Sequence, residues 1–201
     1  MSAPAEMPGT LHPAVRAAAE GELPSWARAG PERRGHMARV AGLLRDWAKE
    51  RGAPPDEVAR WAAAGWLHDA LRDAPPAELR PLVPAGASAF PDPLLHGPAA
   101  AQRLRAEGVA DDGLLRAVAY HSVGDAGFDD LGLATFCADF LEPGRGFRPR
   151  WRARLRRRMP DDLANVAREI VAARIRHHLD ESMGVHPRTV SLWNRLVEGA
   201  G

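Results

Sequence analysis

The amino-acid sequence predicts an all-α fold in one compact domain. Apolar residues recur at steps of three and four along most of the 201 residues, as they do on the buried face of a helix. No segment has the period of two that marks a half-buried strand. The 18 prolines and 19 glycines cluster between the periodic segments, where they end helices. A chain of this length forms one domain with a sizeable core and is too short for two ordinary domains.

The first third of the chain is predicted to carry three helices. Residues 1–10 are small and aperiodic, so we expect them to be disordered and the domain to occupy residues 11–201. A short helix is expected from residue 13 to about residue 20. A longer one is expected over 31–51, with His36, Val40, Leu44 and Trp47 on its inward face. The next begins at Pro54-Pro55, because proline suits the first turn of a helix, and its apolar stripe leads into His68 and Asp69.

The remaining chain divides into a loop and five further helices. Six prolines between residues 73 and 95 break any long element there, which predicts a loop with room for one helical turn. Such a loop is well placed to border a functional site. Helices are expected to resume at about 97–107, 112–121, 129–141 and 161–183, and a last one is expected after His186-Pro187.

The composition excludes several classes of protein. The 27 basic and 26 acidic residues nearly balance, so no global field marks a protein that binds nucleic acid or a membrane surface. No stretch approaches the roughly 20 consecutive apolar residues that a membrane span requires. The single cysteine, Cys137, has no partner for an intramolecular disulfide, and the N-terminus lacks the pattern of a secretory signal. We therefore expect a cytoplasmic protein without a membrane or a specific nucleic acid as partner.

Ionisable residues fall repeatedly on the predicted buried faces of helices. His36 lies with Val40, His68 and Asp69 follow Gly65, His121 follows Val118, and Asp139 follows Thr135. An unpaired carboxylate in an apolar interior is strongly disfavoured, so buried acids are paired, hydrogen-bonded or bound to metal. Each residue alone is compatible with a hydrogen-bonded core histidine or a helix-terminal aspartate. Several imidazoles together with two carboxylates favour a metal site.

These residues form an ordered motif, H…HD…D, at His36, His68-Asp69 and Asp139. A bare HD dipeptide is weak evidence, but the order, the helical context and the intervals make the set more specific. The surrounding segments extend it: ERRGH (32–36), GWLHDALRD (65–73), LLHGPAA (94–100), AVAYHSVG (117–124), CADFLEPGR (137–145) and HPRTVSLWN (186–194). Over about residues 23–198, these segments resemble the HD-domain hydrolases and, among them, the YqeK-like symmetrical bis(5′-nucleosyl)-tetraphosphatases. The resemblance implies an HD-type helical bundle and a metal-dependent phosphohydrolase.

The resemblance also implies a ligand set for two divalent metal ions. The ligands of the first would be His36, His68, Asp69 and Asp139, and Asp69 would bridge to a second ion held by His96 and His121. Imidazole and carboxylate ligands without a thiolate suit iron, manganese, cobalt or zinc, and the resemblance favours iron. Two such ions can lower the pKa of a bound water and neutralise charge on phosphoryl oxygens. Asp69 would thereby be catalytic as well as a ligand.

Two arginines are candidate phosphate ligands. Arg72 stands three residues after Asp69, where the family commonly has lysine, and its forked cation still suits a phosphate. Arg145 closes the EPxR segment beyond Asp139 and could reach a metal-bound phosphate. The sequence departs from the family again at His121-Ser122, which replaces His-Thr and keeps the hydroxyl, and at Phe136-Cys137, whose side chains are bulkier than expected.

Other conspicuous residues are interpreted as structural or, in the case of the four remaining histidines, as solvated or structural. The list comprises His12, His177, His178, His186, the small core residue Cys137, and the packed tryptophans Trp47 and Trp61. Trp66 and Trp151 are not assigned. The basic run from Arg145 to Arg158 contains eight arginines and is interpreted mainly as a solvated helix face, with attraction of a polyphosphate as the alternative.

The sequence thus predicts a hydrolase that converts diadenosine tetraphosphate into two ADP molecules. One alternative is another HD-type phosphohydrolase that acts on a nucleoside mono-, di- or triphosphate or on a cyclic nucleotide. A second is a nucleotide-sensing module that retains metal and has little turnover. The nucleotide is the one partner that the sequence indicates, and the oligomeric state is left open.

Overall fold

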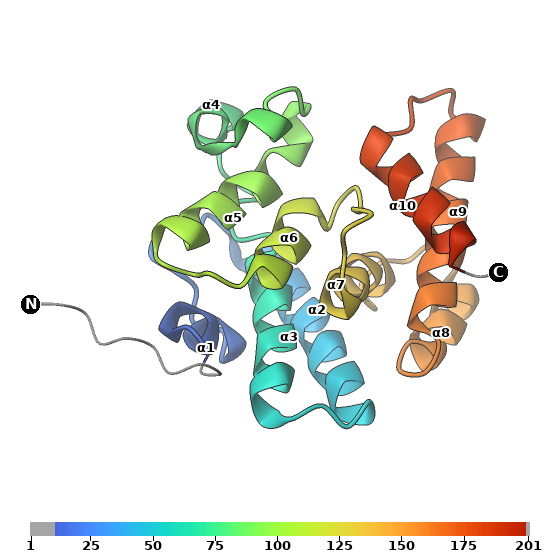
Figure 1. The fold of residues 1–201 in the computed structure, drawn as a ribbon, viewed down its shortest axis with the longest axis horizontal. Coiled ribbons are helices and arrows are strands. Elements are labelled where there is room, and N and C mark those ends of the chain that lie inside the picture. The colour runs from blue at the N-terminus through green and yellow to red at the C-terminus, as the bar shows by residue number, and fades with distance from the viewer. Residues whose placement is uncertain (1–10, 200–201) are drawn as a thin grey trace, which may run out of the picture.

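The computed structural model describes residues 11–199, and all regular elements in this range are helical (Figure 1). The α-helices are α1 (Pro13–Ala19), α2 (Pro31–Glu50), α3 (Pro55–Leu67), α4 (Pro76–Leu79), α5 (His96–Ala106), α6 (Asp112–Tyr120), α7 (Asp130–Leu141), α8 (Pro149–Arg158), α9 (Leu163–Asp180) and α10 (Pro187–Glu198). The all-α prediction is confirmed for this range. The expected disorder of residues 1–10 lies outside the described residues.

Most predicted helix boundaries agree with the structure to within one turn. Proline occupies the first turn of α1, α2, α3, α8 and α10, where its missing N–H has no helical partner to lose and its fixed φ suits the helix. The aspartates Asp111 and Asp129 cap α6 and α7, each accepting a hydrogen bond of 2.9 Å from a backbone N–H of the first turn. Local sequence therefore sets where these helices begin.

The proline-rich segment 73–95 is more ordered than a loop with one helical turn. It contains α4 and three 3-10 turns, Arg80–Leu82, Ala85–Ala87 and Asp92–Leu94. Helix α4 contacts the first of these turns, and the first and third turns contact α5. Phe90, in the same segment, is buried. Frequent proline limits each element to about one turn without preventing the segment from packing.

Helices α2 and α3 form an antiparallel pair at the centre of the molecule (Figure 1). They approach so closely at Gly65 that a Cβ built there would lie 2.4 Å from the Cα of Ala41. Helix α1 covers α3, α5 packs on α6, and α7 packs on α2, α3 and α6. As predicted, Trp47 and Trp61 are buried in the core between these helices. In residues 11–199 no helix has both the length and the apolar content needed to cross a membrane.

Helix α8 was not among the predicted helices and forms much of the basic run. Its Leu155 is buried, and so is Arg152, whose side chain binds the carbonyl oxygens of Phe140, Glu142 and Arg145. Arg156 binds the carbonyl of Leu141 at 2.7 Å. The interpretation of the run as a solvated face is therefore wrong for Arg152, which joins α8 to the end of α7. Helices α8, α9 and α10 stand together on one side of the molecule (Figure 1).

Candidate metal centre and adjoining pocket

Five helix segments bring the six predicted ligands to one place in the core. His36 lies in the second turn of α2, His68 and Asp69 follow the end of α3, His96 begins α5, His121 follows α6, and Asp139 lies in the last turn of α7. All four histidines and Asp69 are buried. Gly65 and Gly97 allow this convergence, because a Cβ on either would lie 2.4–2.6 Å from backbone atoms of a neighbouring helix.

The carboxylate of Asp69 lies at the centre of the cluster. Its Oδ1 is 3.2 Å from His96 Nε2 and 3.5 Å from His121 Nε2. Its Oδ2 is 3.7 Å from His36 Nε2 and 3.6 Å from His68 Nε2. Two groups of potential metal ligands, His36-His68-Asp69 and Asp69-His96-His121, therefore share one aspartate.

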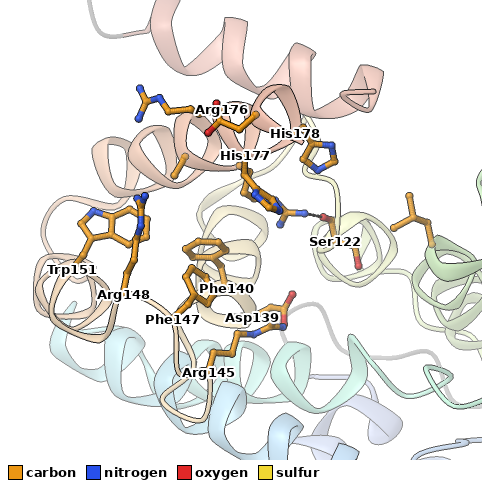
Figure 2. A pocket seen from close by; sticks show the side chains of 14 residues that line it. Ser122, Asp139, Phe140, Arg145, Phe147, Arg148, Trp151, Arg176, His177 and His178 are labelled. Carbon is orange, nitrogen blue, oxygen red and sulfur yellow. Dashed lines mark hydrogen bonds and ion pairs between the residues drawn. The ribbon is translucent and has the colours of Figure 1, made fainter. Parts of the chain in front are cut away.

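Asp139 joins the first of these groups. Its Oδ1 lies 3.2 Å from His36 Nε2 and accepts a hydrogen bond of 2.7 Å from Arg145 (Figure 2). Burial alone would raise the pKa of Asp139, but the hydrogen bond with His36 and nearby charges lower it well below its ordinary value. Asp139 is therefore a carboxylate near neutral pH and offers an anionic oxygen to the cluster.

Backbone carbonyls orient three of the histidines. The Nδ1 atoms of His68, His96 and His121 lie 2.8, 3.0 and 2.9 Å from the carbonyl oxygens of the residues three positions earlier. A carbonyl can only accept a hydrogen bond, so each Nδ1 carries the hydrogen and each Nε2 keeps its lone pair for the cluster. In His36, Nδ1 lies 3.5 Å from the buried carboxylate of Glu142. All four Nε2 atoms thus face inward.

The donor set fits divalent metal ions. The Nε2 atoms of His36 and His68 are 3.3 Å apart, and those of His96 and His121 are 3.2 Å apart. Lone pairs at such distances repel one another unless a proton or a cation lies between them. Imidazole and carboxylate ligands without a thiolate suit first-row transition metals. Divalent cations are therefore the ligands that best satisfy this cluster.

Protonation at neutral pH also favours metal binding by most of the cluster. Burial lowers the pKa of His68 to about 4 and lowers that of His96, which keeps both imidazoles neutral. Burial opposes ionisation of Asp69, but the adjacent histidines outweigh it and hold its pKa well below the usual value. His121 differs, because its hydrogen bond and charge attraction to Asp69 outweigh burial and raise its pKa. Protons therefore compete more strongly with a metal ion at His121 than at His68 or His96.

The two predicted phosphate-binding arginines lie in different environments. Arg145 binds Asp139 and lines a pocket beside the cluster. Arg72 donates a hydrogen bond of 2.6 Å to the carbonyl of Pro93 and lies 3.3 Å from Nδ1 of His96. The guanidinium of Arg72 is therefore in contact with the back of a ligand ring, on the side of the second group.

Sequence reasoning missed Arg33, which belongs to the ERRGH segment. Its Nη1 donates a hydrogen bond of 2.8 Å to Oδ2 of Asp69, and its buried Nε has no hydrogen-bond partner among the described residues. Arg33 stands three residues before His36, so both side chains lie on one face of α2. That spacing was the available signal, and an arginine at such a position is more often solvated.

An open pocket of about 620 Å³ adjoins the cluster and includes Asp139 (Figure 2). Its walls come from the end of α7, the connection to α8, α8 itself and α9. They carry the cationic side chains of Arg145, Arg148, Arg174 and Arg176, the rings of Phe140, Phe147 and Trp151, and the histidines His177 and His178. An anion is therefore favoured here although the whole chain is nearly neutral.

The residues that sequence reasoning set aside have mixed outcomes. His12 and His186 cap α1 and α10 through their side chains, which confirms a structural role. His177 and His178 line the open pocket, and His177 is exposed, which is compatible with the solvated interpretation. Cys137 is buried, and burial raises the pKa of its thiol, which confirms an unreactive core residue.

Comparison with known proteins identifies the family of this chain. The family model described as HD domain matches residues 33–168. The chain is 27% identical over 168 residues to a protein of Halalkalibacterium halodurans named bis(5'-nucleosyl)-tetraphosphatase, symmetrical, with 81% of this chain and 87% of that protein covered. It is 27% identical over 164 residues to a Bacillus subtilis protein of the same name, with 81% and 77% covered.

A solved structure supports the fold. A crystal structure from Clostridium acetobutylicum, described as a predicted HD superfamily hydrolase involved in NAD metabolism, matches with a TM-score of 0.73. The alignment covers 92% of this chain and 96% of that one at 22% sequence identity. The matched model spans most of the chain and includes His36, the His68-Asp69 pair and Asp139. The chain therefore belongs to the HD-domain family of phosphohydrolases.

Proposed function

We propose that this protein hydrolyses dinucleoside tetraphosphates symmetrically and converts diadenosine tetraphosphate into two ADP molecules. The observation that carries the proposal is the sharing of Asp69 between two ligand groups beside a cationic pocket. The names of the two curated relatives favour the tetraphosphate over other nucleotides. The lone buried cysteine suits a reducing compartment, which for this enzyme is the cytoplasm.

His36, His68, Asp69 and Asp139 are assigned to one metal ion, and Asp69, His96 and His121 to a second. Iron is the first choice for both, and manganese, cobalt and zinc suit the same donors. Divalent ions bound there would supply an activated water and positive charge for the phosphoryl oxygens. Tautomers fixed by backbone carbonyls would keep three of the imidazoles ready for the ions without rearrangement.

Arginine side chains are assigned to the phosphate chain. Arg145 and Arg174 line the pocket close to Asp139, and Arg33 approaches from α2 by way of Asp69. Each guanidinium can bind two phosphate oxygens at once, which holds a phosphoryl group in a defined orientation. Arg72 is also assigned to the phosphates, from the side of His96.

The position of the cut tests the proposal. If water attacks one of the two inner phosphorus atoms and the bond to the central bridging oxygen breaks in line, one ADP receives the new oxygen and the other ADP leaves. Hydrolysis of diadenosine tetraphosphate in ¹⁸O-water, followed by mass spectrometry, should place the label in ADP. Labelled AMP or ATP as the main product would contradict the symmetric cut.

The same assay separates the alternatives. A panel of nucleoside mono-, di- and triphosphates and cyclic nucleotides should be consumed much more slowly than the tetraphosphate under iron, manganese, cobalt and zinc. Rapid hydrolysis of a mononucleotide with no reaction of the tetraphosphate would support another HD-type phosphohydrolase. Tight binding of nucleotide without turnover under every metal would support the sensing module.

A further inference from the structure

One end of the pocket is aromatic. Phe140 from α7, Phe147 from the connection to α8, and Trp151 from α8 meet edge to face, with ring centroids 5.5 Å apart for Phe140–Phe147 and 5.9 Å for Phe140–Trp151. Phe147 is 48% exposed, an unusual state for a phenylalanine. Figure 2 shows its ring, with that of Phe140, between Trp151 and Asp139. A large apolar face is therefore open to a ligand.

The wall that carries these rings is firmly built. The buried guanidinium of Arg152 binds the carbonyl oxygens of Phe140, Glu142 and Arg145, which holds the connection between α7 and α8 at its start and middle. Arg152 also lies 4.7 Å from the centroid of the Phe147 ring, on which its cation packs. The ring of Phe147 is thus supported on one side by a buried cation.

Arg148 is held in an unusual conformation at the same end. Its φ of 44° lies in the left-handed region, which residues other than glycine rarely adopt. This conformation precedes Pro149 and places the guanidinium 5.9 Å from the centroid of the Trp151 ring. An aromatic surface and a cation therefore stand together next to the start of α8 (Figure 2).

The opposite end of the pocket carries the charges that face the metal centre. Asp139 and Arg145 lie there, joined by their hydrogen bond (Figure 2), and Arg174 reaches across from α9 to the carbonyl of Ser122. The pocket consequently changes from aromatic to charged along its length. A nucleotide changes in the same way along its length, since its base is aromatic and its phosphate chain is anionic.

We propose that Phe147 and Trp151 form a nucleobase site in which one base of the substrate stacks while its phosphates extend toward Asp139. This inference rests on the proposed function, because it assigns part of the same substrate. Stacking on aromatic rings accepts every base and favours those with the larger ring surface. ADP and GDP should therefore bind alike, and UDP should bind more weakly.

Direct binding provides the test. The full-length protein is titrated calorimetrically with ADP and, separately, with inorganic pyrophosphate, which has the same phosphate groups without the nucleoside. Phe147→Ala and Trp151→Leu should weaken ADP binding by about fivefold to a hundredfold, as expected for loss of stacking on one base, and leave pyrophosphate binding unchanged. Trp151→Phe, which keeps an aromatic ring, should restore most of the affinity for ADP.

A matched control removes apolar surface elsewhere. Val197→Ala truncates an exposed aliphatic side chain on α10 and should change neither titration.

Equal losses for ADP and pyrophosphate, or no loss for either, would overturn the base site, as would ADP binding no tighter than pyrophosphate. Failure to cleave diadenosine tetraphosphate while ADP binding still depends on Phe147 would reject the proposed function and retain the site. Symmetric cleavage of diadenosine tetraphosphate, together with ADP binding that does not depend on Phe147 or Trp151, would support the proposed function and reject the base site.

Discussion

The single carboxylate of Asp69 faces all four histidines of the cluster, two with each oxygen. A residue in that position couples the two proposed metal sites, because any change to it alters both ligand groups. His96 and His121 lie near Oδ1 of Asp69 and form the second ligand group with it, whereas His36 and His68 lie near Oδ2. The two groups can therefore be separated by substitution of these histidines.

We expect His96→Ala and His121→Ala to fold, to retain one metal ion and to lose most activity. Only the second group loses a ligand, and removal of one polarising charge costs several kcal/mol of transition-state stabilisation, which is about a hundredfold or more in rate. Elemental analysis and turnover of diadenosine tetraphosphate measure both effects. His12→Ala, at the start of α1, serves as the control and should retain both metal and activity. Turnover at the parent rate in both cluster variants would refute the assignment.

Arg145→Ala is expected to raise KM without removing metal. The guanidinium of Arg145 is partly exposed in the pocket and binds Asp139 through one nitrogen, so its other donors are open to a phosphate. Loss of a charge-assisted hydrogen bond costs about 1.5–3 kcal/mol, or about tenfold to a hundredfold in KM. Steady-state kinetics with metal analysis checks this. Loss of metal in Arg145→Ala would instead assign it a structural role at Asp139.

Five of the six predicted ligands were accessible from sequence because the apolar period of a predicted helix includes them or leads to them, whereas His96 was indicated only by the family resemblance. Arg33 and Glu142 were not, although both touch the cluster. Charged side chains near helix ends are usually solvated, and only the folded positions of α2 and α7 show that these two are turned inward. Residue type and spacing therefore identified the residues that face the cluster and missed those behind them.

At the scale of helices, the close approach of α2 and α3 depends on Gly65. We expect Gly65→Ala to destabilise the protein by about 1–3 kcal/mol or more, because its Cβ would overlap backbone atoms of Ala41 and force the helices apart. Gly42→Ala on α2 is the matched control. A Cβ at Gly42 meets nothing within 4 Å, so this variant should gain about 0.4–1 kcal/mol through a stiffer unfolded chain. Urea unfolding compares the two, and equal stabilities would refute the close contact.

Helix α6 is fixed at its start by Asp111. This carboxylate caps the helix and pairs with both Nε and Nη2 of Arg60 at 2.6 and 2.9 Å. We expect Asp111→Ala to cost about 1–2 kcal/mol, a typical loss for an N-cap, and Asp112→Ala to cost less than about 0.5 kcal/mol, since Asp112 is exposed. Chemical denaturation of both variants measures the difference.

The contribution of Asp111 should depend on pH. Burial opposes its ionisation, but the hydrogen bonds and charge of Arg60 outweigh burial and lower its pKa. A carboxyl group with a depressed folded pKa stabilises the fold above its unfolded pKa of about 3.9 and loses that stabilisation as pH falls further. The stability difference between parent and Asp111→Ala should therefore stay constant from pH 5 to 7 and shrink below pH 4. A difference that grows on acidification would contradict this.

Helix α8 shows where the period of apolar residues fails to predict a helix. Its inward face includes Arg152 beside Leu155, so a count of apolar residues finds too few for a buried face. The arginine is buried because backbone carbonyls at the end of α7 satisfy its guanidinium. Such partners come from another helix and leave no trace in the local pattern.

For the molecule as a whole, we expect close to two metal ions per chain. The two ligand groups together exceed what one ion needs, and they share Asp69. Because metal binds the folded chain only, a chelator should lower the melting temperature by roughly 10–20 °C, the shift expected for two ions that are each present at about a hundred times their dissociation constant. Elemental analysis and thermal melts with and without chelator check both. Reconstitution that stops at one ion would leave the second site unsupported.

The global architecture was easier to predict than the pocket. The helical periods, the punctuating prolines and the ordered H…HD…D motif are properties of neighbouring residues. The pocket combines Ser122, the stretch that contains Asp139, Phe147 and Trp151, and His177, which come from three separate segments of the chain. No interval between them is fixed by a local rule, so their meeting depends on how α7, α8 and α9 pack.

The arginines of α8 have an electrostatic consequence. Phe140, Leu141 and Glu142, whose carbonyls Arg152 and Arg156 bind, lie at the C-terminal end of α7, where the helix macrodipole concentrates partial negative charge. Asp139 adds a full negative charge in the same turn. The two guanidinium groups act as counter-charges at that helix terminus. A polyphosphate that approached the proposed metal centre would therefore meet a helix end whose repulsive field is already offset by these two arginines.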